Sequence, residues 1–135
     1  MSNNIYTDGA CSGNPGIGGW GAVILIGDNE PININGGSLN TTNNQMELKA
    51  AIEALKYFSN SSSINLFTDS KYVKDGIETW IHNWKKNGWK TKSNKNVKNQ
   101  NLWIELDQQI LKHNINFNWI RGHAGNKFNE IADNL

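Results

Sequence analysis

Cysteine is almost absent from this chain of 135 residues, in which Cys11 stands alone. A single thiol cannot form an intrachain disulfide, and it rules out a zinc site built from cysteines. The first residues also lack the basic segment and apolar run of a secretion signal, and no stretch is apolar for the length of a membrane span. We therefore expect an intracellular, cytoplasmic protein, and the length suits a single domain over residues 1–135.

Net charge is also nearly absent, at +1, but the charged residues are unevenly placed. Residues 85–98 contain six lysines and no acidic residue, which leaves a net charge of −5 on the remainder. A charged segment of this kind is usually a solvated loop. Here, however, Trp80, Trp84 and Trp89 border or interrupt the segment, and solvated loops seldom keep such large apolar rings. Lysines interleaved with aromatic rings favour a surface that binds the sugar-phosphate backbone of a nucleic acid.

Short apolar runs predict three antiparallel strands in the first third of the chain. The first run, residues 5–7, ends at an Asp-Gly pair, and the glycine-rich segment 9–19 that follows is expected to be a loop. The second strand is expected over residues 19–26 and the third over residues 31–39, with the turn signal at 27–29 between them. Strands that follow one another in this way form a meander.

Helices and strands alternate in the rest of the sequence. Apolar residues at helical spacing predict an amphipathic helix over residues 44–59, with Asn43 or Asn44 as its N-cap. The elements expected after it are a strand at 64–68, short helices at 72–77 and 79–84, a helix at 102–110, a strand at 115–119, a loop at 121–129 and a brief closing helix. Since helical crossovers separate the later strands, this order predicts a mixed α/β sheet with helices packed on it.

Four carboxylates occupy positions at which the predicted fold could gather them. Asp8 and Asp69 each directly follow a short predicted strand. Glu47 lies in the first turn of the predicted helix, and Asp133 lies near the end of the closing helix. Each of the first three alone has a structural explanation, as a turn or cap residue. Together at one sheet edge they would repel one another unless cations neutralised them, and oxygen-only ligands suit Mg²⁺ or Mn²⁺.

A carboxylate site of this kind points to the hydrolysis of a phosphodiester. Two metal ions about 4 Å apart can activate a water on one side of the bond and stabilise the leaving oxygen on the other. His123 lies in the glycine-flanked segment RGHAG, and the unperturbed pKa of a histidine, about 6.5, suits proton transfer near neutral pH. A histidine in a loop is more often a plain surface residue. The nearness of His123 to Asp133 in the sequence favours a functional role for it.

Five segments of the chain match the motifs of one enzyme family, in the family's order. They are TDGACSGNPG, with Asp8; TTNNQMELKAAIEAL, with Glu47; FTDSKYVKDGI, with Asp69; WIHNWKKNGWKT, the basic aromatic segment; and RGHAGNKFNEIAD, with His123 and Asp133. On these segments, which together cover nearly the whole chain, the sequence resembles the type 1, or bacterial-type, ribonuclease H family. The resemblance implies a single ribonuclease H catalytic domain with the ribonuclease H-like α/β fold: a five-stranded mixed sheet, its first three strands antiparallel, with helices packed on both faces.

The same resemblance implies an activity and a set of site residues. The activity is internal cleavage of the RNA strand of RNA/DNA hybrids by a two-metal-ion mechanism, leaving a 5′-phosphate and a 3′-hydroxyl, with little base-sequence preference. The implied cofactor is Mg²⁺, with Mn²⁺ as a substitute. The implied metal ligands are Asp8, Glu47, Asp69 and Asp133, with His123 assisting proton transfer or product release. The residues implied for the substrate are Asn14, Asn43 and Asn44 in the minor groove, where RNA shows its 2′-hydroxyls, Thr42 and Asn99 on a DNA phosphate, and Trp80, Trp84, Lys85, Lys86 and Lys90 in a handle that grips the hybrid.

Several features depart from the family pattern. Asn40 stands where many relatives carry an arginine beside the DNA phosphate, Lys71 where an amide is common, and Asn87 where a basic residue is frequent. The chain also ends two residues after Asp133, and because a short terminal helix frays easily we expect that carboxylate to be held less firmly. We expect activity, at a level that these changes could lower.

Three other functions are compatible with parts of the pattern. A non-catalytic module that binds hybrids would keep the basic segment, but it has no need of carboxylates at all four motif positions. An integrase-like nuclease or strand-transfer enzyme would use acids and two metals on DNA, whereas the asparagine- and glycine-rich segments after Asp8 and before Glu47 favour the hybrid. A structural scaffold would require every motif to be coincidental. No segment indicates an oligomer interface, so we expect a monomer that binds no membrane.

Overall fold

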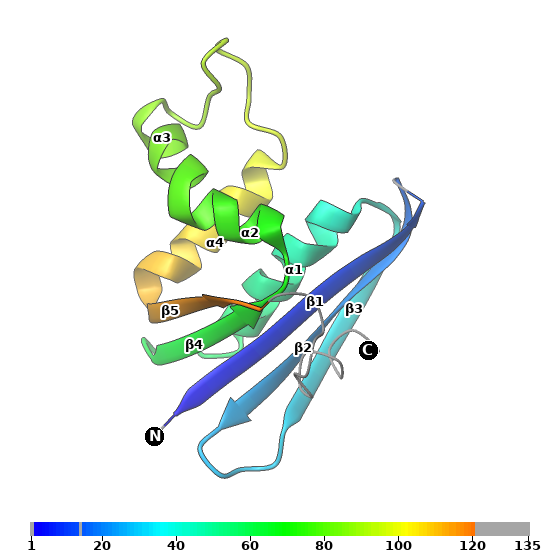
Figure 1. The fold of residues 1–135 in the computed structure, drawn as a ribbon, viewed down its shortest axis with the longest axis vertical. Coiled ribbons are helices and arrows are strands. Elements are labelled where there is room, and N and C mark those ends of the chain that lie inside the picture. The colour runs from blue at the N-terminus through cyan, green and yellow to red at the C-terminus, as the bar shows by residue number, and fades with distance from the viewer. Residues whose placement is uncertain (1, 14, 121–135) are drawn as a thin grey trace.

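A computed structural model describes residues 2–13 and 15–120 of the chain. These residues form one five-stranded sheet with helices stacked against it (Figure 1). The elements are β1 (Asn3–Gly13), β2 (Gly16–Ile26), β3 (Ile32–Thr41), α1 (Asn43–Lys56), β4 (Ser63–Thr68), α2 (Lys71–Asp75), the π-helix η1 (Gly76–Trp80), α3 (Ile81–Lys86), α4 (Gln100–Lys112) and β5 (Asn114–Trp119). None of the described helices combines the length and the apolar character needed to cross a membrane.

The sheet is mixed and has the strand order β3-β2-β1-β4-β5. β1 and β3 each pair antiparallel to β2, while β4 runs parallel to β1 on one side and to β5 on the other. Strands joined by short turns stay neighbours, whereas α1 carries the chain back so that β4 enters the sheet parallel to β1. The antiparallel meander and the five-stranded mixed sheet expected from the sequence are confirmed.

One hydrophobic core joins the sheet to the helices. Ile5 of β1 and Ile24 of β2 are fully buried against α1, and α4 adds Trp103 and Leu106 to the same cluster. Because α1, α2, α3 and α4 all contribute to this one core, they lie on the same face of the sheet. Within the described part of the chain no helix covers the opposite face, and the predicted loop and closing helix fall at 121–135, outside the described residues. Helices on both faces therefore remain a prediction.

Strand β1 is longer than the sequence predicts. A loop is expected after Asp8, but β1 continues to Gly13 and pairs with β2 along its whole length, with Asp8 opposite Gly21. Glycine and serine have little strand propensity of their own, so the extended conformation here is held by pairing with the neighbouring strand. For the same reason β2 begins at Gly16, earlier than expected.

The start of α1 also differs from the prediction. Its N-cap is Thr42, not Asn43 or Asn44: the Thr42 hydroxyl accepts a hydrogen bond from the Gln45 N–H at 3.2 Å. The Gln45 side chain in turn accepts from the Thr42 N–H at 3.3 Å, which completes a capping box. Since the helix begins at Asn43, Glu47 is its fifth residue and lies in the second turn, not the first.

The two short helices expected at 72–77 and 79–84 are one continuous helical segment in the structure. The π-helix Gly76–Trp80 joins α2 to α3 without a break. A Cβ at Gly76 would collide with the buried indole ring of Trp103, so only glycine allows this segment to pass so close to α4. The expected separation into two helices is therefore wrong.

Candidate active site

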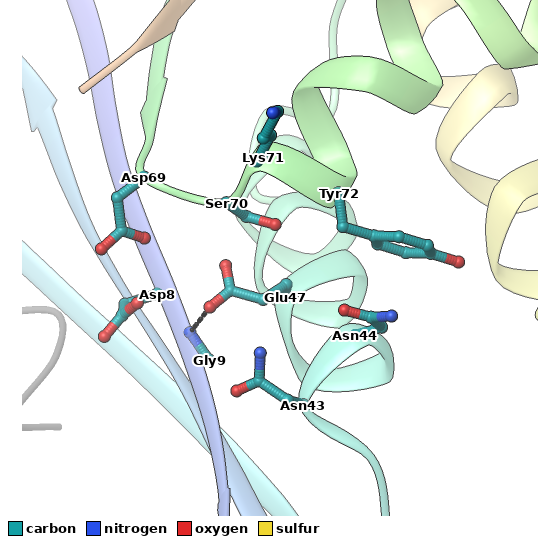
Figure 2. A pocket seen from close by; sticks show the side chains of 9 residues that line it. All are labelled: Asp8, Gly9, Asn43, Asn44, Glu47, Asp69, Ser70, Lys71 and Tyr72. Carbon is teal, nitrogen blue, oxygen red and sulfur yellow. Dashed lines mark hydrogen bonds between the residues drawn. The ribbon is translucent and has the colours of Figure 1, made fainter. Parts of the chain in front are cut away.

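Three carboxylates converge from three different elements. Asp8 comes from β1, Glu47 from α1, and Asp69 is the residue that follows β4 (Figure 2). Each offers one carboxylate oxygen, and these oxygens all lie within 4.8 Å of one another. Asp8 and Glu47 are each only 5% exposed. The structure thus brings together three acidic residues that are well separated in the sequence.

The parallel pairing of β1 with β4 places Asp8 beside Asp69. Thr7 and Thr68 are register partners, so the residues that follow them, Asp8 and Asp69, lie at the same level of the sheet. Asp69 directly follows its strand, as the sequence predicts, whereas Asp8 lies within β1, which continues along β2. The indole N–H of Trp119, at the end of β5, donates to the Asp69 carbonyl oxygen at 3.2 Å, and this contact ties the Asp69 segment to the sheet.

Glu47 reaches the two aspartates because α1 approaches β1 very closely at Gly9. A Cβ added at Gly9 would lie 2.5 Å from the carbonyl carbon of Met46 and 2.6 Å from the backbone nitrogen of Glu47. Without that atom, the Gly9 N–H donates to Glu47 Oε1 at 2.9 Å (Figure 2). A hydrogen bond to an ionised carboxylate is stronger than a neutral one, so it orients Glu47 firmly. Gly9 is therefore the contact point that aims Glu47, and not the start of a loop.

The charges of the cluster call for a cation. Two ionised carboxylates about 5 Å apart repel each other by about 3 kcal/mol at an effective dielectric constant near 20, and three acids form three such pairs. A divalent cation among them converts this repulsion into attraction. Donors that are all oxygen, carried on strand β1, helix α1 and the residue that follows β4, fit Mg²⁺ or Mn²⁺.

The carboxylates line a pocket of about 370 Å³. Its lining is polar and consists of Asp8, Gly9, Asn43, Asn44, Glu47, Asp69, Ser70, Lys71 and Tyr72. Asn43 and Asn44, which the sequence predicts for the minor groove, come from the first turn of α1 (Figure 2). Lys71, one of the departures from the family pattern, lines the same pocket from the start of α2. The pocket thus places two side-chain amides beside the carboxylates.

A second surface gathers aromatic and basic side chains around α3 and the loop after it. A pocket of about 400 Å³ is lined there by Trp80, Asn83, Trp84, Lys86, Asn87, Lys90, Thr91 and Lys92. This lining includes four of the five residues predicted for the handle. Lys85, the fifth, pairs instead with the buried Asp107 of α4, with 3.3 Å between Nζ and Oδ1. The rings of Trp80 and Trp84 lie 5.9 Å apart between centroids and form the apolar part of this surface.

Thr42 and Asn99, the predicted phosphate contacts, lie close together although they are far apart in the sequence. Gln45 connects them, since its Oε1 accepts from the Thr42 N–H at 3.3 Å and its Nε2 donates to Asn99 Oδ1 at 3.1 Å. Asn99 Nδ2 donates in turn to the Tyr72 hydroxyl at 3.1 Å. Sequence reasoning missed Gln45 and Tyr72. The Thr-x-x-Gln capping pattern could have indicated Gln45, but no local signal marks Tyr72.

The remaining predicted residues can be placed only in part. Asn40 is exposed near the end of β3, and Asn87 lines the aromatic and basic pocket. Asn14, His123 and Asp133 lie outside the described residues, so their assignments stay predictions.

Comparison with known proteins points to one family. The model of the family described as RNase H matches residues 1–135. The chain is 55% identical over 131 residues to Ribonuclease H of Rhodopseudomonas palustris (strain BisB5), which covers 97% of this chain and 87% of that relative. It is 56% identical over 132 residues to Ribonuclease H of Rhizobium meliloti (strain 1021), covering 98% and 86%. Among solved structures, LC9-RNase H1, described as a type 1 RNase H with the type 2 active-site motif, matches with a TM-score of 0.84 and 33% identity over 98% of this chain and 68% of that one.

A mixed five-stranded sheet that gathers carboxylates near a basic aromatic surface defines the class of metal-dependent nucleases. Within that class, the chain belongs to the ribonuclease H family. The resemblance that the sequence motifs carry is confirmed, and so is the expected mixed sheet.

Proposed function

We propose that the chain cuts the RNA strand of RNA/DNA hybrids internally, using divalent metal ions held by Asp8, Glu47 and Asp69. The observation that carries the proposal is the convergence of these carboxylates, whose oxygens lie within 4.8 Å of one another. Asp133 is proposed to complete the set of ligands. A non-catalytic module that only bound hybrids would have no use for a cluster of mutually repelling acids, since each pair costs stability unless a cation is bound.

The proposed cofactor is Mg²⁺, with Mn²⁺ as a substitute. Asp8, Glu47 and Asp69 would hold such ions, which would supply an activated water and stabilisation of the leaving oxygen for a cleavage that leaves a 5′-phosphate and a 3′-hydroxyl. The described residues hold the oxygen ligands in place. The Gly9 N–H keeps Glu47 oriented, and the pairing of β1 with β4 keeps the two aspartates together. His123 is proposed to assist proton transfer or product release.

The choice of RNA over DNA is assigned to asparagine side chains beside the metal ligands. An amide can both donate to and accept from a 2′-hydroxyl, which the DNA strand lacks. Asn43 and Asn44 line the same pocket as the carboxylates, so a ribose next to the reacting phosphate comes within their reach. Asn14 is proposed to act with them. Because such contacts involve sugar and phosphate, we expect little preference for base sequence.

The DNA strand is proposed to be held at two other places. Thr42 and Asn99 bind one of its phosphates, and the aromatic and basic surface formed by Trp80, Trp84, Lys86 and Lys90 grips the hybrid further along. Lys85 is on the same helix, but its ammonium group is paired with Asp107, so we expect a smaller contribution from it. We further propose that residues 1–135 act as one catalytic domain, as a monomer in the cytoplasm, where the single thiol of Cys11 would stay reduced.

The test is a cleavage assay on four matched substrates. A short hybrid labelled on its RNA strand is incubated beside an RNA duplex, a DNA duplex and single-stranded RNA, each with Mg²⁺, with Mn²⁺ and with EDTA. The proposal predicts internal cuts in the RNA of the hybrid alone, with either metal and not with EDTA. Hybrid binding without cleavage would contradict it in favour of the non-catalytic module. Cleavage of the DNA duplex would contradict it in favour of an integrase-like enzyme.

A further inference from the structure

A chain of hydrogen bonds runs from the start of α1 to the interior of α4. Thr41 and Thr42 donate to Gln45, Gln45 donates to Asn99, and Asn99 donates to Tyr72. The indole N–H of Trp103, which is fully buried, also donates to the Tyr72 hydroxyl, at 3.0 Å. These links connect α1, α2 and α4 beside the carboxylate pocket, and every one involves a side chain.

The amide of Gln45 has only one orientation that satisfies its neighbours. Its Oε1 accepts from the Thr41 hydroxyl at 2.8 Å and from the Thr42 N–H at 3.3 Å. The Thr42 N–H can only donate, so it requires an oxygen there and the amide nitrogen must point the other way; the Thr41 hydroxyl donates to the same oxygen. Nε2 then meets Asn99 Oδ1 at 3.1 Å. Thr41 is only 4% exposed, so this end of the chain is shielded from solvent.

The orientation of Gln45 fixes the orientation of Asn99. With its oxygen held by Gln45, Asn99 presents its NH₂ group, and one N–H donates to the Tyr72 hydroxyl at 3.1 Å. The second N–H remains as a donor. Tyr72 does not enforce this arrangement by itself, because a hydroxyl can accept from an amide nitrogen or donate to an amide oxygen. A reversed Asn99 would instead point its NH₂ at the NH₂ of Gln45, which repels it.

We propose that Gln45 is a positioning residue that orients the Asn99 amide so that an N–H, and not the oxygen, faces the DNA phosphate. This inference rests on the proposed function, which places Asn99 on that phosphate. An amide oxygen turned toward a phosphate would repel it, whereas an N–H donated to an anion forms a strong hydrogen bond. Gln45 acts through Asn99 and does not itself contact the hybrid. Asn99 precedes α4 with a backbone φ of 60°, and its side chain makes no capping hydrogen bond to that helix.

The direct test is Gln45→Met, which keeps the side-chain length and removes the amide. The KM for the hybrid is expected to rise roughly five- to tenfold, while kcat stays within about twofold, because a contact to a charged group is lost away from the reacting phosphate. The dependence of log KM on log salt concentration should stay unchanged, because a neutral amide that meets a phosphate releases no counterions. A residue that only capped a helix would change the melting temperature without changing KM.

Two further variants separate positioning from stability. Thr41→Val removes a donor to Gln45 at a buried site that cannot touch the hybrid, and should raise KM about two- to threefold. Ile64→Val, which alters a core residue at the start of β4, is the control: it should lower the melting temperature and leave KM unchanged. If Gln45→Met does not fold, Thr41→Val alone still decides the inference.

A double-mutant cycle tests whether Gln45 acts through Asn99. Asn99→Gly removes the amide and tolerates the left-handed backbone. Once it is made, adding Gln45→Met should raise KM no further. Additive effects, or a normal KM for both Gln45→Met and Thr41→Val, would overturn the inference. A normal KM for Asn99→Gly would overturn it together with the phosphate contact, while a wild-type chain that leaves hybrids intact would instead overturn the proposed function.

Discussion

The close approach of α1 to β1 makes Gly9 a position where a single added methyl group should disturb the carboxylate site. In Gly9→Ala, the new methyl group would lie 2.5 Å from the Met46 carbonyl carbon, and ordinary contact begins at 3.4 Å. Helix α1 must therefore move by about 0.9 Å or tilt, since the crowding atoms are backbone. Overpacking of this kind costs about 1–3 kcal/mol of unfolding free energy, or roughly 3–15 °C of melting temperature in a chain of this size.

The same movement carries Glu47 away from Asp8 and stretches the hydrogen bond from the Gly9 N–H, now 2.9 Å long. A displacement of about 1 Å at a catalytic group can lower a rate by about a hundredfold. We therefore expect the cleavage rate of Gly9→Ala to fall roughly 10- to 100-fold at a temperature where circular dichroism shows it folded. Gly19→Ala is the matched control, because among residues 2–13 and 15–120 its methyl group would meet only the Gly36 carbonyl oxygen, at 3.4 Å. Equal rates and melting temperatures for the two variants would refute the reasoning.

Two further predictions concern stability and binding. Burial lowers the pKa of His113 below its usual 6.5, and the charge of Lys112 lowers it further. Since the folded state thus disfavours the charged imidazole, the contribution of His113 to the free energy of unfolding should be fully present above about pH 6.5 and be lost as the pH falls below it. Urea unfolding between about pH 5 and 8 should show this loss in the wild type and less of it in His113→Gln. Lys85→Met breaks the pair with Asp107 and should lower the unfolding free energy by about 1 kcal/mol, whereas Lys86→Met should chiefly weaken hybrid binding and its salt dependence. Chemical unfolding measures the stability of the two lysine variants, and a salt titration measures their affinity for the hybrid. Equal stability and equal affinity in the two variants would contradict the prediction.

Much of the fold could be predicted because its signals are local. Apolar runs and turn residues locate all five strands, and helical spacing locates α1 and α4. The errors arose where tertiary contacts override local preference. The glycine-rich half of β1 is extended only because β2 pairs with it, and the helical segment at Gly76 is continuous only because a glycine lets it pass Trp103. Neither cause can be read from neighbouring residues.

The candidate site divides in the same way. Asp8, Glu47 and Asp69 lie in motifs that can be recognised in the sequence, and the structure brings them together. The residues that orient the site lie in no motif that the sequence displays for that role. The contact of Gly9 with α1 is invisible in a sequence that suggests a turn there, and the link from Gln45 to Asn99 joins segments whose spacing has no pattern.

The measurement that tests the central claim most directly is hybrid cleavage by Asp69→Asn beside Asp75→Asn. Asp75 belongs to the neighbouring helix α2 and lies 4.0 Å from the Lys74 ammonium, so it matches the chemical change without touching the cluster. Loss of a metal ligand should lower the cleavage rate of Asp69→Asn by roughly 100-fold or more, and Mg²⁺ should no longer raise its melting temperature. Asp75→Asn should behave as the wild type in both respects. Cleavage by Asp69→Asn at the wild-type rate, with the same dependence on metal, would contradict the assignment of the carboxylate cluster as the metal site.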